Sequence, residues 1–311
     1  MINRFLHPFF VIGLICLSVA NIYAQKKSKR NSNRVQSILF IGNSFTFAHG
    51  SPAKFYHPAS VTDLNNTNIG GVPALFKAFT LEAGLDFTVS LETSPGQNLD
   101  YHLKEKATVI AKPWDYVVMH GYSTMDKNKP GNPSAMAISA KEIATLLRSQ
   151  NPDVAIYLVA TWARADQVYQ QTGFWYGQTI EKMTLDIWNG YNVVAKKALI
   201  NEVIPVGKAW NRAIKTGVAD ADPYDGVDVG KINLWTTDNY HGSSFGYYIV
   251  ALMDFSAITG DDPICLGKNE SAAKELGFSA AQTVALQKIA HDELCARKGY
   301  PALKKFKVKL Q

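Results

Sequence analysis

The sequence lacks internal repeats and low-complexity tracts, which excludes an array of repeated units. Cysteine is also scarce, with three in the whole chain. Cys16 lies in an apolar run near the N-terminus, whereas Cys265 and Cys295 follow much later and have no C-x-x-C partner. A structural zinc site is therefore not expected. The two later cysteines would either form one disulfide or remain two free thiols.

Most of the chain carries no net charge. The formal charge of +6 comes from six basic residues among the first 36, a segment without an acid. Removing those six from the 32 basic residues leaves 26, against 26 acidic residues. Nucleic-acid binding depends on an excess of basic side chains, so a nucleic-acid partner is not expected.

No uninterrupted apolar run has the length of about 20 residues that a transmembrane helix needs. The run PFFVIGLICLSVA follows Arg4, and Ala24 suits the position just before a cleavage site. Residues 1–24 are therefore predicted to be a signal peptide, with an uncleaved N-terminal anchor as the alternative. Residues 25–36 are predicted to be a disordered polar linker. The mature protein would then be secreted or periplasmic, without stable insertion in a membrane.

Five apolar runs have the length and composition of strands. They cover residues 37–42, 87–92, 115–120, 154–161 and 202–207. Helical periodicity fills most of the gaps, with clear amphipathic segments at residues 72–84, 134–152, 179–200 and 244–260. This alternation predicts one α/β domain over residues 37–311, with an open parallel sheet covered by helices on both faces. Ligands in such folds bind beyond the carboxyl ends of the strands.

A serine follows the first predicted strand directly, in the run Gly42-Asn43-Ser44. A serine hydroxyl needs an adjacent base to act as a nucleophile. The segment TTDNYHGSS places Asp238 three residues before His241, a spacing that lets the carboxylate orient the imidazole. Each feature alone has an ordinary explanation, because Ser44 suits a turn and Asp238 suits an Asx-turn.

The combination of Gly42-Asn43-Ser44 with Asp238-x-x-His241 resembles the SGNH hydrolases, also called the GDSL family. Over residues 37–262 the chain is most similar to a secreted bacterial branch that opens with a GNSFT block. The resemblance implies a three-layer α/β/α sandwich and ester hydrolysis without a metal or an organic cofactor. It also implies a catalytic triad in which Ser44 attacks, His241 is the base and Asp238 orients His241.

The resemblance further implies an oxyanion hole. Its donors would be the backbone N–H groups of Ser44 and of Gly96, although Pro95-Gly96 is also a generic turn. The third family block normally reads G-x-N-D, and its asparagine is a third donor. This chain has GYST there, with Ser123 in place of the asparagine. Ser123 is predicted to replace it, with Tyr122 or His120 as alternatives.

The stretch of residues 164–177 is rich in aromatic side chains. Such side chains can stack on sugar rings or acyl groups, or they can simply cover the edge of the sheet. The predicted substrate-binding residues are His120, Tyr122, Trp162, Trp175 and Tyr176. The sequence thus predicts a secreted serine esterase for short acyl esters, chiefly acetyl, on carbohydrate. The alternatives are a lipid or other small-ester hydrolase and a catalytically idle glycan-binding protein. The oligomeric state stays open.

Overall fold

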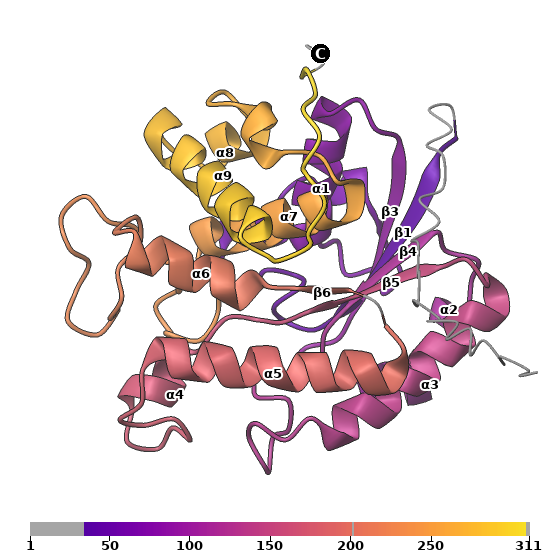
Figure 1. Ribbon diagram of the computed structural model, residues 1–311. Coiled ribbons are helices and arrows are strands. Elements are labelled where there is room, and N and C mark those ends of the chain that lie inside the picture. Colours follow the sequence, from indigo (N-terminus) through magenta and orange to yellow (C-terminus); the bar gives the residue numbers. More distant parts are fainter. Residues whose placement is uncertain (1–33, 201, 309–311) are drawn as a thin grey trace, which may run out of the picture. The chain divides into compact units, whose positions relative to one another are not determined.

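The computed structural model describes residues 34–200 and 202–308. The predicted signal peptide and most of the predicted linker lie outside these residues. The described chain forms one parallel sheet with helices on both faces (Figure 1). Its strand order is β2-β3-β1-β4-β5-β6. The strands are β1 (Gln36–Gly42), β2 (Thr62–Asp63), β3 (Phe87–Thr93), β4 (Tyr116–Met119), β5 (Ala155–Val159) and β6 (Glu202–Ile204).

Five of these six strands are the ones that the sequence predicts. β2 is the addition, and its two residues pair with β3 at the edge of the sheet, a segment too short to leave a periodic pattern. β6 ends at Ile204 and not at residue 207 as predicted. Pro205 follows it, and proline cannot donate to a strand ladder, so the chain turns there into a helix. The predicted linker also extends too far, because Gln36 already belongs to β1.

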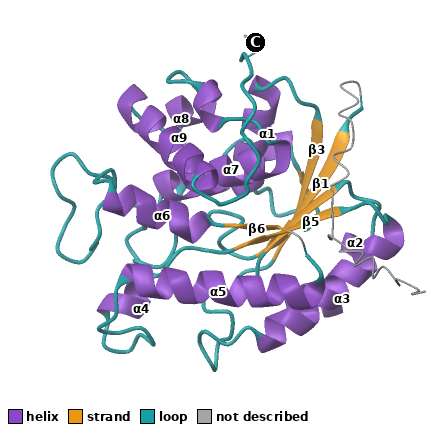
Figure 2. Ribbon diagram, in the orientation of Figure 1, coloured by secondary structure: helices purple, strands orange, loops and turns teal. Residues whose placement is uncertain are grey.

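The helices form two layers, one on each side of the sheet (Figure 2). One layer contains α1 (Gly71–Glu82), α7 (Ser244–Thr259), α8 (Ser271–Glu275) and α9 (Ala280–Cys295). The other contains α2 (Leu99–Ile110), α3 (Ser134–Gln150) and α5 (Ile180–Ala198). Two further helices, α4 (Ala165–Tyr169) and α6 (Val206–Lys215), lie toward the carboxyl ends of the strands (Figure 1). No helix in the described residues is long and apolar enough to cross a bilayer.

β1 is the strand on which the rest is built. It pairs in parallel with β3 on one side and with β4 on the other. The side chains of residues 38–41 are all buried, which explains why this strand is continuously apolar and does not alternate. Burial of each such side chain contributes about 1.5–3 kcal/mol to folding. These buried side chains therefore fix the position of the end of β1, which Ser44 follows.

The two later cysteines are free in the structure. Cys265 lies in the short 3₁₀ helix η3 (Pro263–Leu266), and Cys295 is the last residue of α9. The Sγ of Cys295 lies 3.7 Å from Nε2 of His291. The sequence allowed either a disulfide or two free thiols, and the structure has two free thiols.

Candidate active site

The loop after β1 is held by Asn43. Its Nδ2 donates to the carbonyl oxygens of Gln97, at 3.0 Å, and Gly121, at 3.1 Å. Its Oδ1 accepts a hydrogen bond from the N–H of Phe45 at 3.1 Å. Gln97 belongs to the loop after β3 and Gly121 to the loop after β4. Asn43 thus joins three neighbouring strand ends directly beside Ser44, which is itself buried.

A buried histidine, His120, supports this loop through hydrogen bonds. Nε2 of His120 lies 2.7 Å from the hydroxyl of Thr46, and Nδ1 lies 2.9 Å from the carbonyl oxygen of Gly121. Because a carbonyl can only accept, Nδ1 carries the proton and the hydroxyl of Thr46 donates to Nε2. Burial lowers the pKa of His120 to about 4, so the ring is neutral. Gly42 makes room for this contact, since a Cβ there would lie 2.2 Å from Oγ1 of Thr46.

The prediction that His120 binds substrate is therefore corrected. The ring is buried and both nitrogens already have partners within the protein. His120 instead fixes the loops after β1 and β4 relative to each other.

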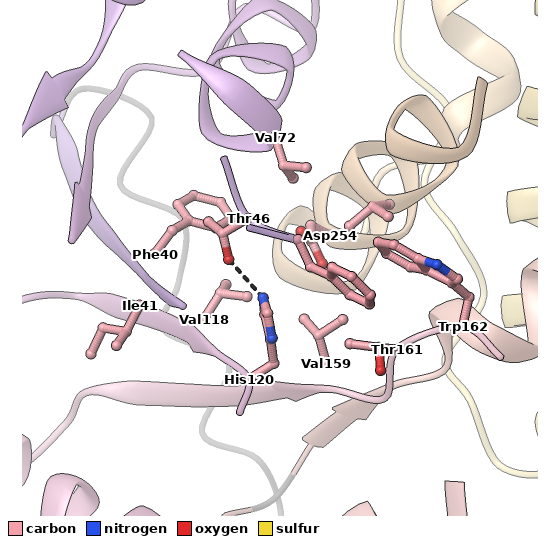
Figure 3. Close-up of a pocket in the computed structure, with 12 residues that line it drawn as sticks. Phe40, Ile41, Thr46, Val72, Val118, His120, Val159, Thr161, Trp162 and Asp254 are labelled. Atoms are coloured by element: carbon pink, nitrogen blue, oxygen red, sulfur yellow. Dashed lines mark hydrogen bonds between the residues drawn. The ribbon is translucent and has the colours of Figure 1, made fainter. Parts of the chain in front are cut away.

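A small cavity lies next to this histidine (Figure 3). Its volume of about 10 Å³ matches about one water molecule and is far below the roughly 300 Å³ of a small substrate pocket. Two polar side chains in its wall, Thr161 and Asp254, each have a buried oxygen without a hydrogen-bond partner among the described residues. Burial raises the pKa of Asp254 well above its ordinary value, so this carboxyl is protonated. The cavity belongs to the support of the site and is too small to bind substrate.

Asp238 and His241 form a hydrogen-bonded pair in the segment before α7. Oδ2 of Asp238 accepts from Nδ1 of His241 at 2.6 Å. Oδ1 accepts from the hydroxyl of Thr236 at 2.7 Å, and from the N–H groups of Tyr240 and His241 at 3.0 and 2.9 Å. Partial burial acts to raise the pKa of Asp238, but these hydrogen bonds together hold it well below its usual range. The carboxylate is therefore ionised, and it keeps the proton of His241 on Nδ1.

The imidazole of His241 is neutral and has one nitrogen without a partner among the described residues. Burial lowers its pKa, the hydrogen bond and charge of Asp238 act in the opposite direction, and the nearby His49 and Arg164 lower the pKa further. The net effect is a pKa below the ordinary value, so the imidazole is unprotonated at neutral pH. Nε2 is buried, and no residue in the described part of the chain forms a hydrogen bond with it. This nitrogen is free to accept a proton.

Ser44 lies close to this base through its neighbours in sequence. The ring of Phe45 meets the imidazole of His241 edge-on, with centroids 5.6 Å apart, and the ring of His49 lies 4.6 Å from it. The hydroxyl of Tyr247, on α7, lies 3.4 Å from the carbonyl oxygen of Ser44 and 3.2 Å from that of His49. Between the described residues, the Ser44 hydroxyl and Nε2 form no direct hydrogen bond. In sites without substrate this bond is often long and tightens in the complex.

The other predicted oxyanion donors follow β3 and β4. Gly96 has φ +63° and is exposed, and a Cβ there would meet nothing within 4 Å. Glycine is thus favoured at position 96 by the turn and not by lack of space. Ser123 is buried, and within the described chain its hydroxyl has no hydrogen-bond partner. Burial, with Asp100 and Tyr240 nearby, raises the pKa of Tyr122, so its half-buried phenol keeps its proton.

Two of the predicted substrate-binding tryptophans lie in the interior, and those predictions are corrected. Trp162, 1 % exposed, is stacked between Phe45 at 4.0 Å and Trp210 at 4.5 Å. Trp175 is also buried, and its Nε1 donates to Asp186 at 2.9 Å. A ring enclosed on both faces has no surface to offer a ligand. Because Trp162 follows a strand, the sequence predicted correctly that it lies at the carboxyl edge of the sheet. The sequence did not predict that its side chain points into the interior.

Tyr176, in contrast, is 52 % exposed, as is its neighbour Phe174 at 61 %. Their loop is tied to α4, because Gln167 accepts a hydrogen bond from the N–H of residue 175 at 3.0 Å. The N–H of Asp166 in α4 in turn donates to the carbonyl oxygen of Asn239 at 3.2 Å. The exposed aromatic side chains are therefore attached to the same segment that carries Asp238 and His241.

Sequence reasoning missed three side chains around the base. His49 comes five residues after Ser44, and only that spacing hints at a role. The guanidinium of Arg164 lies 3.5 Å above the ring of Tyr240, which lies 4.1 Å from the imidazole of His241. Nothing in their spacing reveals this stack, because it joins the loop after β5 to the segment before α7. In the described residues, no group of three His, Cys, Asp or Glu side chains could hold a metal ion.

Comparison with known proteins identifies the fold. The sequence matches no family model and no curated protein. Among solved structures, the chain is similar to a DUF4886 family protein of Bacteroides uniformis, with 17% identity, a TM-score of 0.55, and coverage of 88% of this chain and 100% of that one. It is also similar to a protein of Parabacteroides merdae named as a GDSL-like lipase, with 16% identity, a TM-score of 0.52, and coverage of 73% and 98%. The chain has the α/β/α fold of the SGNH hydrolases, and the predicted fold class is confirmed.

Proposed function

We propose that this chain is a serine ester hydrolase in which Ser44 is the nucleophile, His241 the base and Asp238 the group that orients the base. One observation carries the proposal. Nδ1 of His241 donates to Asp238 at 2.6 Å, and the buried Nε2 is left without a partner in the described chain. The rings of Phe45 and His49, one and five residues after Ser44 in sequence, contact the same imidazole.

The mechanism is acyl transfer in two steps. Oγ of Ser44 attacks the acyl carbon while Nε2 of His241 takes its proton, and Asp238 stabilises the imidazolium. The backbone N–H groups of Ser44 and Gly96 hold the oxyanion. The intermediate collapses, and His241 returns the proton to the leaving alcohol. A water molecule, deprotonated by His241, then attacks the acyl-enzyme, which releases the acid and restores Ser44.

As substrate we propose a short acyl ester, chiefly acetyl, carried on a carbohydrate. The exposed Phe174 and Tyr176 support a sugar ligand, because aromatic faces stack on sugar rings and their loop is bonded to α4. The predicted signal peptide makes the enzyme secreted or periplasmic, where polysaccharides are within reach.

The test is hydrolysis of p-nitrophenyl acetate, butyrate and octanoate by the wild type and by Ser44→Ala. Ser149→Ala is the matched control, because it makes the same change on the exposed face of α3. We expect the wild type and the control to prefer acetate, and Ser44→Ala to lose at least roughly 10³-fold in kcat. Acetate release from acetylated xylan then tests the carbohydrate. A preference for octanoate would indicate a lipid esterase, and an inert wild type that binds xylan would indicate a glycan-binding protein.

A further inference from the structure

Asn98 occupies the N-cap of α2 without capping it. An asparagine at this position normally accepts a hydrogen bond from the first turn of its helix, worth about 1 kcal/mol. Here the side chain makes no such bond. Its Oδ1 instead accepts from the N–H of Tyr122, in the loop after β4, at 3.1 Å. The amide therefore turns away from its own helix toward the oxyanion region.

The loop after β4 is shaped to receive this amide. A Cβ built on Gly121 would lie 2.0 Å from Oδ1 of Asn98 and 3.2 Å from its Cγ. Any residue other than glycine at position 121 would displace the side chain. Gly121, the glycine of the third family block, thus has a physical role in holding Asn98.

The same contacts place Asn98 near the nucleophile. Asn43 lies directly before Ser44, and its Nδ2 donates to the carbonyl oxygens of both Gln97 and Gly121. Gln97 is the residue before Asn98, and Gly121 is the residue that its amide contacts. The Asn98 amide is consequently fixed at the junction of the three strand ends that surround Ser44.

The free end of this amide is a donor without an acceptor. Tyr122 N–H must face an oxygen, so the nitrogen of the amide is necessarily the other atom. Nδ2 forms no hydrogen bond within the described chain and, although Asn98 is only 8 % exposed as a whole, this atom is open to solvent. Nδ2 can therefore donate to the oxygen of a ligand that displaces the solvent.

We propose that Nδ2 of Asn98 is the third donor of the oxyanion hole and replaces the asparagine missing at position 123. This inference rests on the proposed esterase function and assigns to Asn98 the role predicted for Ser123. The two side chains differ in preorganisation. The Asn98 amide is fixed by Tyr122 and Gly121, whereas the hydroxyl of Ser123 has no partner within the described residues to set its direction. His120 is excluded because both of its nitrogens are bonded.

Asn98→Asp tests the donor. Aspartate has the same shape and still offers an oxygen to the N–H of Tyr122, but it replaces the donor by an anion facing the oxyanion. We expect kcat for p-nitrophenyl acetate to fall at least about 10²–10³-fold, with KM changed less than about threefold, since only transition-state binding is lost. Ser123→Ala removes the competing candidate donor, and its rate should stay within about threefold of the wild type. A wild-type rate in Asn98→Asp, or the larger loss in Ser123→Ala, would overturn the proposal.

A second measurement needs no substitution and covers the case in which Asn98→Asp does not fold. In a crystal structure of the wild type phosphonylated at Ser44, a phosphoryl oxygen should lie 2.7–3.1 Å from Nδ2 of Asn98. That oxygen bonded to Ser123 and away from Asn98 would refute the assignment. Wild-type protein without Ser44-dependent hydrolysis would remove the proposed function and this inference together. Ser44-dependent hydrolysis with no contact to Asn98 would remove only the inference.

Discussion

Asp238→Asn isolates the role of the carboxylate in orienting the base. Oδ1 accepts three hydrogen bonds, from Thr236 and from the backbone of residues 240 and 241, and the side-chain oxygen of asparagine can keep these. Its NH₂ group would then face Nδ1 of His241, where Oδ2 lies at 2.6 Å. An NH₂ group donates, so the imidazole must move its own proton to Nε2. The folded loop is expected to persist while the base loses its free lone pair.

The expected loss is about 10⁴-fold in kcat, equivalent to roughly 5.4 kcal/mol of transition-state stabilisation. The assay is the pH dependence of kcat for p-nitrophenyl acetate, together with thermal unfolding to check the fold. Because Ser44 and the oxyanion donors remain, residual hydrolysis should still exceed that of buffer. A decrease of less than about tenfold in a correctly folded Asp238→Asn would refute the orienting role. Asp186→Asn, on α5, is the matched control.

Three further predictions concern titration and support of the site. kcat/KM should rise with pH through a midpoint below 6.5, because the pKa of His241 is lowered and only the neutral ring is a base. His49→Gln should move this midpoint upward, because the nearby His49 contributes to lowering the pKa of His241, and an unchanged midpoint would contradict the assignment. A carboxyl whose pKa is raised on folding destabilises the protein at any pH above the pKa that the group has in the unfolded chain. Asp254→Asn should therefore raise the free energy of unfolding in urea at pH 7, and this gain should disappear below about pH 4. An equal gain at pH 7 and below pH 4 would oppose this. Thr46→Val should cost about 1–3 kcal/mol in the same measurement, because Nε2 of His120 is left buried without a donor, and unaltered stability would count against that hydrogen bond.

The fold could be read from the sequence because its main strands are buried on both faces. Residues 38–41 form a continuous apolar run, and that pattern is hard to mistake. β2 was not predicted, because a strand of two residues is too short to show a periodic pattern of apolar residues. The end of β6 was misjudged because the apolar residues Val206 and Gly207 continue the run beyond Pro205, although they already belong to α6.

The residues of the candidate triad could be proposed from the sequence because each part of it is a local pattern. Asp238 and His241 lie three residues apart, and Ser44 follows a strand. The support of the site was not predictable, since it depends on contacts between distant segments. Asn98 reads as a helix cap from its neighbours, and only the folded chain places its amide against Gly121 and Tyr122. Trp162 was misjudged for the same reason, because its partners Phe45 and Trp210 come from other elements.

The most direct test of the central claim, that Ser44 is an activated nucleophile, is covalent labelling. The wild type is incubated with p-nitrophenyl ethylphosphonate, p-nitrophenol release is followed, and the adduct is located by intact mass and peptide mapping. If Ser44 is an activated nucleophile, one adduct per chain forms on Ser44, is absent from Ser44→Ala and forms much more slowly in His241→Ala. No adduct, an adduct on another residue, or equal labelling of wild type and Ser44→Ala would contradict it.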